Sequence, residues 1–555
     1  MAFGHPSSWR SALALSLGLI ACLVAACSET ASSEAIPPGV VQYHAHVRPI
    51  FESRCIGCHQ ADGIGSFSMQ FDPAEWQSGA PPWVTSALDA IESGRMPPWL
   101  PKEGCRDLAY ERRLSADELG LLTAWKEQGL PQGAPATYPG PRAIEAPEPL
   151  GEPDVVVEPT EAYAPSESAT DDYRCFVLPQ EFEAETYLRA TNVLPGDSRI
   201  VHHALLFLIP PTSLAAIEKL DAAEDGPGYT CFGGPGGGVL TTLGAWVPGS
   251  VTVPTQPGSA MVIPKGSKVV LQVHYNTIAL GGAKPPSERS KVRLWTAQEK
   301  PTHRVELLPM AHLGMAVPAG DPASVEERLF RIPTDGTLVS LAPHMHLLGT
   351  TIEASLEPAE PARGASKETC LIDIPRWDFD WQQTYALTAS SAVPVKKGDG
   401  LRLRCTYDNS AENQPILGGS KKMPTDVTWG EGTLDEMCLL FIGIQVPIDA
   451  PDFRCGSFET CQATCKKGDA GCFFDCSTVG GGQCADCLIR GVGKCAPSYC
   501  LEDGAALAKC LGACKDDAPN CLRNACRAEF DAFYGCMEPH IENGDCDVHL
   551  SACGL

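Results

Sequence analysis

The amino-acid sequence predicts a multidomain protein with a small all-α domain, two all-β sandwich domains and a C-terminal disulfide-rich α-helical module. Three observations lead to this prediction. The 555 residues are enough for about three to five domains. In the centre of the chain, short apolar runs alternate with Gly/Pro turns, as in β-rich folds. Of the 26 cysteines, 16 follow residue 450, and that density indicates disulfides formed in an oxidising compartment.

The charge balance excludes a nucleic-acid-binding protein. The chain has 68 acidic and 42 basic residues, a formal net charge of −26. A protein that binds nucleic acid needs positive charge to displace the counterions of the phosphates. We therefore expect no nucleic-acid partner.

The start of the chain has the pattern of an export signal. The apolar run Ala12–Ala26 is short for a membrane span and ends in small residues. Val24–Cys27 resembles a bacterial lipobox, so we predict lipidation of Cys27; Cys22 and an ordinary signal peptide are the alternatives. The lipid would anchor the protein to a membrane without spanning it. Ser28 favours the outer membrane, with the protein facing the periplasm or the cell surface.

A haem-attachment motif follows. Cys55-Ile56-Gly57-Cys58-His59 places two thiols to add to the haem vinyl groups and a histidine to ligate the iron. A redox or zinc motif is the alternative. Met96, on a proline-rich loop, is the predicted second axial ligand because a thioether raises the iron potential. His44 and His46 are alternatives, and we expect both at the surface.

A second helix closes this domain. Ser115–Glu118 is a capping box that predicts a helix ending at Gly129. A helix, the haem motif, a methionine loop and a closing helix together resemble a class I cytochrome c, which implies electron transfer. Nine prolines between residues 131 and 165 then indicate a semi-extended spacer.

Five histidines of the central region lie inside apolar, strand-like runs: His202, His203, His274, His344 and His346. His344 and His346 are two residues apart, so on a strand both rings leave one face and can share a metal. His202 and His203 are adjacent, so sharing a metal there needs a bulge or a distorted backbone. One buried histidine is usually a core residue, but five in apolar strands predict metal ligands.

The motifs His-His, Gln-x-His-Tyr, His-x-His and Asp-Glu-Met-Cys follow one another between residues 154 and 450. Their order and spacing resemble the copper type II, ascorbate-dependent monooxygenases. The resemblance implies two jelly-roll-like domains, 154–300 and 301–450, with one copper ion in each. It implies two ligand sets: His202, His203 and His274 for one copper, and His344, His346 and Met437 for the other. A thioether favours Cu(I), whereas zinc rarely takes methionine.

Several cysteines fit this picture. Cys405 and Cys438 match a disulfide of the family, and Cys175 and Cys231 are expected to pair in the first sandwich. Cys105 and Cys370 have no partner that the sequence predicts. The chain also departs from the peptide-amidating members of the family, whose carboxylate-binding residues are replaced by Ala342, Leu439 and Phe441.

The last part of the chain is a cysteine-rich module. Three cysteine pairs spaced four residues apart would each lie on one helix face, namely Cys461/Cys465, Cys472/Cys476 and Cys510/Cys514. Facing helices cross-linked by two disulfides explain this spacing; zinc binding is the alternative. The predicted division is therefore a signal peptide at 1–27, a linker at 28–40, the cytochrome c-like domain at 41–133, a proline-rich linker at 134–153, sandwiches at 154–300 and 301–450, and this module at 451–555.

The sequence thus predicts an exported copper monooxygenase that inserts one oxygen atom of dioxygen into a C–H bond of a small molecule. His344, His346 and Met437 would form the catalytic site. The electrons would come through the fused haem domain, with ascorbate or a periplasmic donor as external reductant. A copper-binding electron-transfer protein without oxygenase activity is the alternative, and an envelope interaction protein with structural sandwiches is a third.

Overall fold

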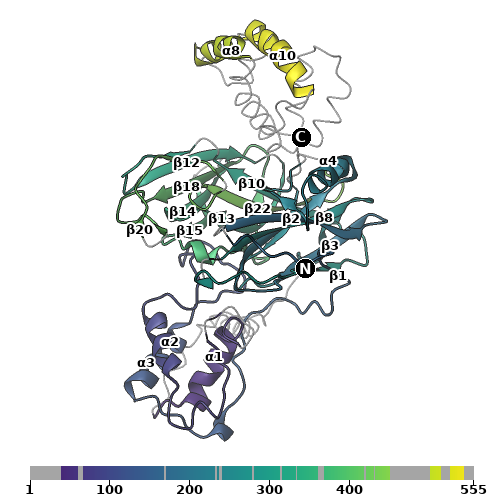
Figure 1. Cartoon of the computed structure of the whole chain (residues 1–555). Coiled ribbons are helices and arrows are strands. Elements are labelled where there is room, and N and C mark those ends of the chain that lie inside the picture. The colour runs from purple at the N-terminus through teal and green to yellow at the C-terminus, as the bar shows by residue number, and fades with distance from the viewer. Residues whose placement is uncertain are drawn as a thin grey trace, which may run out of the picture. The chain divides into compact units, whose positions relative to one another are not determined.

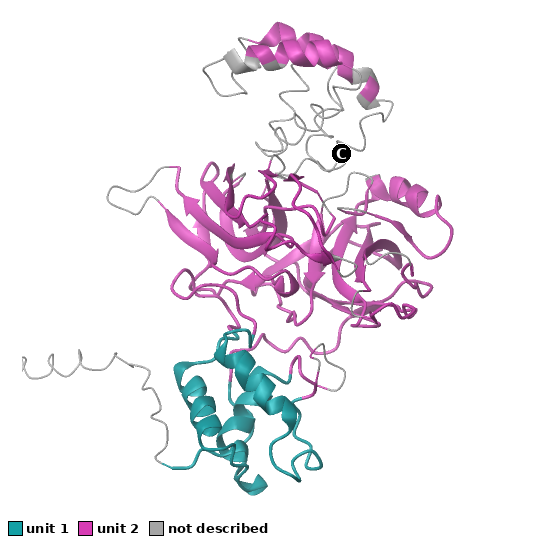
Figure 2. Ribbon diagram, turned by 60° about the vertical axis from the view of Figure 1, so that its left-hand side comes forward, with its two compact units in different colours: residues 1–56, 69–97, 112–143 teal, residues 57–68, 98–111, 144–555 magenta. Residues whose placement is uncertain are grey.

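The computed structural model describes most of residues 39–450 and two helices of the tail. The described ranges are 39–60, 65, 67–167, 171–231, 234–236, 241–277, 280–312, 315–332, 334–359, 368–417, 420–430, 432–450, 500–513 and 526–542. The predicted signal peptide, lipidation of Cys27 and most of the cysteine-rich module lie outside these ranges. None of the helices described is long and apolar enough to cross a membrane. The chain forms two compact units, coloured separately in Figure 2.

The first unit, within residues 1–56, 69–97 and 112–143, is small and helical. Its helices are η1 (Tyr43–Val47), α1 (Arg48–Arg54), α2 (Pro82–Glu92), α3 (Ala116–Glu127) and η2 (Pro135–Thr137). The predicted capping box is confirmed, because the Ser115 hydroxyl accepts from the Glu118 N–H and the Glu118 carboxylate accepts from the Ser115 N–H. Buried aromatic rings form the core, with Tyr43 stacked on Trp76 at 4.0 Å. The assignment as a cytochrome c stays a prediction.

The second unit contains β-sandwich sheets. A five-stranded sheet has the order β5 (Tyr229–Thr230), β2 (Asp171–Glu181), β8 (Lys268–Asn276), β4 (Val201–Ile209) and β6 (Thr242–Trp246). β8 is buried between its two end residues and lies between β2 and β4, to which it is hydrogen-bonded (Figure 1). α4 (Pro211–Asp221) follows β4, and its Ile217 packs with Cys175 and Phe207 of the sheet.

A nine-stranded sheet joins the two sandwiches. Its order is β1 (Val155–Val157), β9 (Lys291–Thr296), β3 (Thr186–Leu194), β7 (Ser259–Ile263), β10 (His303–Ala311), β22 (Leu439–Pro447), β13 (Gly336–His344) and β16 (Tyr385–Ala386), with β17 (Val393–Val395) also paired to β13. β7 and β10 pair in parallel. The first sandwich therefore shares a continuous sheet with the second, which the alternating sequence pattern did not indicate.

The remaining strands complete the second sandwich. They are β12 (Ser324–Arg331), β18 (Gly400–Tyr407), β14 (Gly349–Glu357) and β15 (Thr369–Ile374) in a four-stranded sheet, and the pairs β11 (Ala316–Val317) with β21 (Val427–Thr428) and β19 (Ile416–Leu417) with β20 (Ser420–Lys421). A short helix, η4 (Phe379–Trp381), lies between β15 and β16. Alternate residues of β22, such as Leu440 and Ile442, point into the core of this sandwich.

Five disulfides are present among the described residues, which indicates a protein that folds in an oxidising compartment. Two are the pairs that the sequence predicts, Cys175–Cys231 and Cys405–Cys438. A third joins Cys105 to Cys370, for which the sequence predicted no partner. In the tail, Cys500–Cys536 and Cys510–Cys526 join α8 (Leu501–Ala513) to α10 (Arg527–Glu542), with Cys500 and Cys526 lying just before the two helices. Of the predicted pairs spaced by four residues, only Cys510 lies within the described residues, so that pairing stays a prediction.

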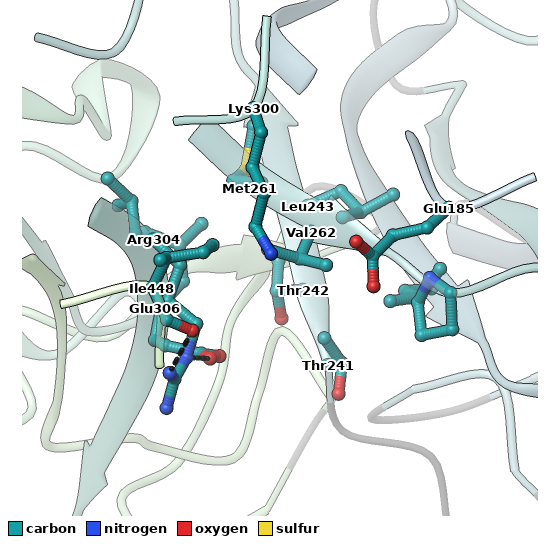
Figure 3. A pocket seen from close by; sticks show the side chains of 14 residues that line it. Glu185, Thr241, Thr242, Leu243, Met261, Val262, Lys300, Arg304, Glu306 and Ile448 are labelled. Carbon is teal, nitrogen blue, oxygen red and sulfur yellow. Dashed lines mark hydrogen bonds and ion pairs between the residues drawn. The ribbon is translucent and has the colours of Figure 1, made fainter. Parts of the chain in front are cut away.

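A cavity of about 190 Å³ lies where β6, β7 and β10 meet (Figure 3). Met261 and Leu243 line it together with charged side chains. Arg304, which also lines the cavity, has hydrogen-bond partners within the protein: its guanidinium donates to Glu306 at 2.8 Å and to the Ala450 carbonyl at 2.8 Å. None of the five candidate histidines lines this cavity.

Candidate metal centres

The first histidine cluster forms where β4 and β8 pair. His203 lies opposite His274, and the register shifts between Val201 and His203. This irregularity is the backbone distortion that adjacent metal-binding histidines require, and it brings the ring of His202 to the same site. The ring centroids of the three histidines lie 4.8–5.3 Å apart, and one nitrogen from each lies within 4.8 Å of the others.

The nitrogens of this cluster are arranged for a metal. The Nε2 atom of His274 lies 2.9 Å from the Asp171 carboxylate, while its Nδ1 atom is buried without a hydrogen-bond partner. The carboxylate therefore holds the proton on Nε2 and leaves the Nδ1 lone pair exposed to the cluster. The Nδ1 atoms of His202 and His203 face each other at 3.2 Å. Three imidazole nitrogens converging in this way fit copper, for which imidazole is a suitable ligand in either oxidation state.

The second histidine pair lies at the end of β13. The rings of His344 and His346 meet edge to face, with centroids 5.1 Å apart. The Nδ1 of His344 donates to the Gln382 amide oxygen at 2.5 Å, because the Gln382 amide nitrogen is used by the Phe379 carbonyl. The Nδ1 of His346 donates to the Asp435 carbonyl at 3.0 Å. Both Nε2 lone pairs are therefore left for a ligand.

Met437 lies beside His346. β13 and β22 pair in antiparallel register, with His344 opposite Leu439. The ladder ends at that pair, and beyond it the backbone N–H groups of His346 and Met437 both donate to the Glu436 carboxylate, at 2.9 and 3.3 Å. The Met437 side chain is buried, and its carbonyl accepts from the Tyr407 hydroxyl at 2.9 Å. The backbone segments that carry the histidine pair and the predicted thioether ligand are therefore joined through one carboxylate, and a donor set of two imidazoles and a thioether would favour Cu(I).

Phe379 lies between the two clusters. Its ring stacks on His202 with a centroid distance of 5.2 Å and meets His346 edge to face at 6.1 Å. Sequence reasoning did not single out this phenylalanine, since η4 is a short helix outside the histidine motifs. Its ring contacts a histidine of each cluster.

With both clusters described, one comparison with protein families covers the region of the second one. Residues 324–466 match the family model "Copper type II ascorbate-dependent monooxygenase, C-terminal domain". The matched region contains His344, His346 and Met437. It supports a copper-dependent monooxygenase, an oxidoreductase, in general terms. No curated protein matches the chain.

Solved structures add nothing to this assignment. The major capsid protein P2 from bacteriophage PM2 is 9% identical, with 53% of this chain and 97% of that chain covered and a TM-score of 0.23. A223, a turret protein of Sulfolobus turreted icosahedral virus, is 10% identical, with 53% and 99% covered and a TM-score of 0.12. Likeness at this level carries no argument about fold or function.

A buried carboxyl holds the backbone around the second histidine pair. Glu436 is fully buried and accepts from the backbone N–H groups of His346 at 2.9 Å, Leu348 at 2.6 Å and Met437 at 3.3 Å. Burial raises the pKa of Glu436 to about 8. The sequence motif contained this residue, but only the structure shows that it fixes the loop after β13. Sequence reasoning also missed Asp171 and Gln382, because the histidines they bind are remote from them in sequence.

The predicted haem-attachment motif begins at the end of α1. Cys55 caps α1, with its N–H donating to the Phe51 carbonyl at 2.9 Å, and Cys55 and Cys58 are thiols outside any disulfide. The Nδ1 of His59 lies 3.1 Å from the Phe67 carbonyl, which leaves its Nε2 for a ligand. A Cβ atom on Gly65 would lie 2.4 Å from that Nδ1, so only glycine fits there.

His44 and His46, the alternative axial ligands, were expected at the surface, and neither is fully exposed. His44 is fully buried, its ring lies 4.7 Å from that of Phe71, and neither ring nitrogen has a hydrogen-bond partner. The prediction that His44 lies at the surface is therefore wrong, because the wide turn of η1 points it into the aromatic core. His46 is half-buried, and its Nδ1 accepts from the Gln42 N–H at 3.0 Å. Met96 follows α2, with its N–H donating to the Ala90 carbonyl at 3.1 Å.

The stability of the metal-free protein should fall in acid. Burial lowers the pKa of His202 to about 4, of His344 to about 3 and of His346 to about 4. Below about pH 6.5 the histidines of the unfolded chain become protonated, whereas the same imidazoles in the folded protein stay neutral. The free energy of unfolding therefore decreases as the pH falls, until the folded pKa values are reached. Each histidine contributes up to about 1.4 kcal/mol per pH unit. Urea unfolding at pH 7 and pH 5 measures this, and equal midpoints would contradict it.

Asp171 should matter for metal affinity. Its carboxylate accepts from His274 and from the Asn276 amide at 3.0 Å, so it fixes the ring and the tautomer of a ligand. Asp171→Ala is expected to weaken copper binding at the first cluster by about 10–100-fold. Competitive titration with a Cu(I) chelator measures the change. Asp197→Ala is the matched control, because Asp197 binds Arg199 rather than a histidine; an equal loss there would contradict this role.

Proposed function

We propose that the protein is a copper-dependent monooxygenase that inserts one oxygen atom of dioxygen into a C–H bond of a small molecule. The supporting observation is the first histidine cluster, in which one nitrogen from each of three imidazoles lies within 4.8 Å of the others, together with a second histidine pair whose rings lie 5.1 Å apart. One copper ion would be held by His202, His203 and His274, and the other by His344, His346 and Met437. The second set would be the catalytic site.

The chain's own residues prepare these sites. Bound copper would supply the one-electron redox chemistry that dioxygen activation needs. Neutral imidazoles are ready to coordinate without first losing a proton, because burial keeps their pKa values low. Asp171 and Gln382 hold the proton on the ring nitrogen away from the metal position. Phe379 packs against one histidine of each cluster and so helps to orient both rings.

We also propose that a covalent haem supplies the electrons. It would be attached through Cys55 and Cys58, with His59 and Met96 as axial ligands and His44 as the rival for the second position. His59 fits this role because its Nδ1 is engaged by a carbonyl and its Nε2 is not. A donor tethered by a short linker has an effective concentration of roughly millimolar. Ascorbate or a periplasmic donor would then reduce the haem again. Lipidation at Cys27 would keep the protein at the outer membrane.

The surface beside His344 suggests the kind of substrate. Ala342 pairs with Phe441 and His344 with Leu439, so these side chains share one face of the β13–β22 ladder. On the adjacent strand β10, Pro309 and Ala311 pair with the same two β22 residues and extend this face. The strand residues that pair with His344 or flank it on this face are apolar, and its ring nitrogen is bonded to Gln382 from outside the ladder. An apolar substrate without a carboxylate fits this surface.

A peptide ending in glycine should therefore be a poor substrate. Ala342, Leu439 and Phe441 offer neither a charge nor a hydrogen bond to a carboxylate, and burying one unpaired is costly. We expect no detectable hydroxylation of a glycine-extended peptide by protein that carries its full copper content. Mass spectrometry of the peptide after turnover with a chemical reductant measures this. Efficient hydroxylation would contradict the proposed specificity.

The function itself is tested on the full chain purified from an export-competent host. We expect one covalent haem and two copper ions per chain, and transfer of one labelled oxygen atom from ¹⁸O₂ to a member of an apolar metabolite library. One copper ion, or zinc in both places, would overturn the proposal. Haem and two copper ions without any oxygen transfer would favour the alternative, an exported electron-transfer protein.

A further inference from the structure

Residues 98–111, which follow the Met96 loop, fold as part of the second sandwich. Cys105 is bonded to Cys370 of β15, across 265 residues of sequence. Leu108 forms a β-bridge with Leu387 and is buried in the core of this sandwich. The segment is therefore an integral part of the domain that carries His344, although it comes from between the two helices α2 and α3.

Polar contacts hold the same segment along its length. The Arg106 guanidinium donates to the Cys370 carbonyl at 2.8 and 3.1 Å and to the Ser391 carbonyl at 3.1 Å. The Lys102 N–H donates to the Asp373 carbonyl at 2.7 Å. Since these bonds use backbone acceptors on both sides of the disulfide, the segment is fixed at several independent points.

An aromatic pair begins this segment. The rings of Trp99 and Tyr385 meet edge to face, with centroids 5.3 Å apart and an interplanar angle of 90°. Tyr385 lies in β16, opposite Leu341 of β13, three residues before His344. Gln382, three residues before Tyr385, accepts the His344 hydrogen bond. Two short connections, one through β13 and one through Gln382, therefore join the aromatic pair to His344.

The chain itself limits how far Met96 can be from this pair. Met96 precedes Trp99 by three residues, so the two Cα atoms lie within about 11 Å of each other in any conformation. We propose that residues 98–111 form the electron-entry path to the His344/His346 site, with the Trp99–Tyr385 contact as its first step. This inference rests on the proposed function and adds to it the site at which electrons arrive.

The step is a one-electron transfer. Ferrous haem becomes ferric, and a cupric ion at the His344/His346 site becomes cuprous, with no bond made or broken. Two such transfers supply the two electrons that a monooxygenase draws from its donor.

The test uses the full, metal-loaded chain without oxygen or substrate. The haem is reduced by a light pulse with a photoreductant, and its reoxidation by the cupric ions is followed by absorbance. Trp99→Leu is expected to lose the fast phase, and Trp99→Phe to keep most of it because an aromatic ring remains. Trp295→Leu, which changes a tryptophan of β9 in the first sandwich, is the matched control and should keep the fast phase. Copper content and thermal unfolding are measured for each variant to show that it is folded.

The destination is tested with ligand variants. His203→Ala should retain the fast phase, whereas His346→Ala should lose it. An unchanged fast phase in Trp99→Leu, or the reverse behaviour of the two histidine variants, would overturn the path while leaving the proposed function in place. Wild-type protein that lacks covalent haem or copper would overturn the proposed function, and this inference with it.

Discussion

Met437→Ile is expected to lower oxygen transfer more than about 100-fold, because loss of even an outer-shell partner typically costs 10–100-fold. Met437 is buried just before β22, next in sequence to the Cys405–Cys438 disulfide, and its N–H shares the Glu436 carboxylate with the N–H of His346. Isoleucine has a similar volume and no sulfur, so the change should cost less than about 1.5 kcal/mol of stability. What is lost is the soft donor that favours Cu(I) beside two imidazoles.

The measurement is ¹⁸O incorporation by copper-loaded protein, together with thermal unfolding. Met310→Ile is the matched control, because Met310 lies in the neighbouring strand β10 and is buried in the core instead of at the histidines. His203→Ala should behave differently, losing the first copper ion while the second remains. If Met437→Ile turned over at the wild-type rate, Met437 would not be a ligand.

The sequence was informative where chemistry follows from local spacing. His344 and His346, two residues apart at the end of a strand, were predicted to share a face, and they lie edge to face in the structure. The adjacent His202 and His203 were predicted to need a distorted backbone, and the register shift after Val201 provides it. Such expectations depend on strand periodicity, which is a property of a few neighbouring residues.

The groups that orient these histidines could not be predicted in this way. Asp171 is 103 residues from His274, and Glu436 is 90 residues from His346. Neither carboxylate has a local pattern that reveals its partner. Cys105 and Cys370 had no predicted partner for the same reason, since the segment between them folds into both units. Likewise, His44 was expected at the surface because its sequence neighbours do not reveal the aromatic core that buries it.

Glu436→Leu is expected to lower the free energy of unfolding by at least about 3 kcal/mol. Leucine fills a similar space but accepts no hydrogen bond, so the buried N–H groups of His346, Leu348 and Met437 would lose their acceptor. Each buried donor left unsatisfied costs about 1–3 kcal/mol. Because the three donors belong to the loop and the strand that carry two of the predicted ligands, the second copper ion should be lost as well.

Glu436→Gln separates the hydrogen bonds from the charge. Burial raises the pKa of Glu436 to about 8, so the protonated, neutral form predominates at pH 7 and glutamine resembles it in charge. The amide oxygen still accepts, and the loss of stability should be well below that of Glu436→Leu. Urea unfolding of the metal-free variants and copper analysis of the loaded ones measure both effects. Equal losses in the two variants would mean that the carboxylate charge, rather than its acceptor oxygens, holds the His344–Leu348 loop against the Met437 strand.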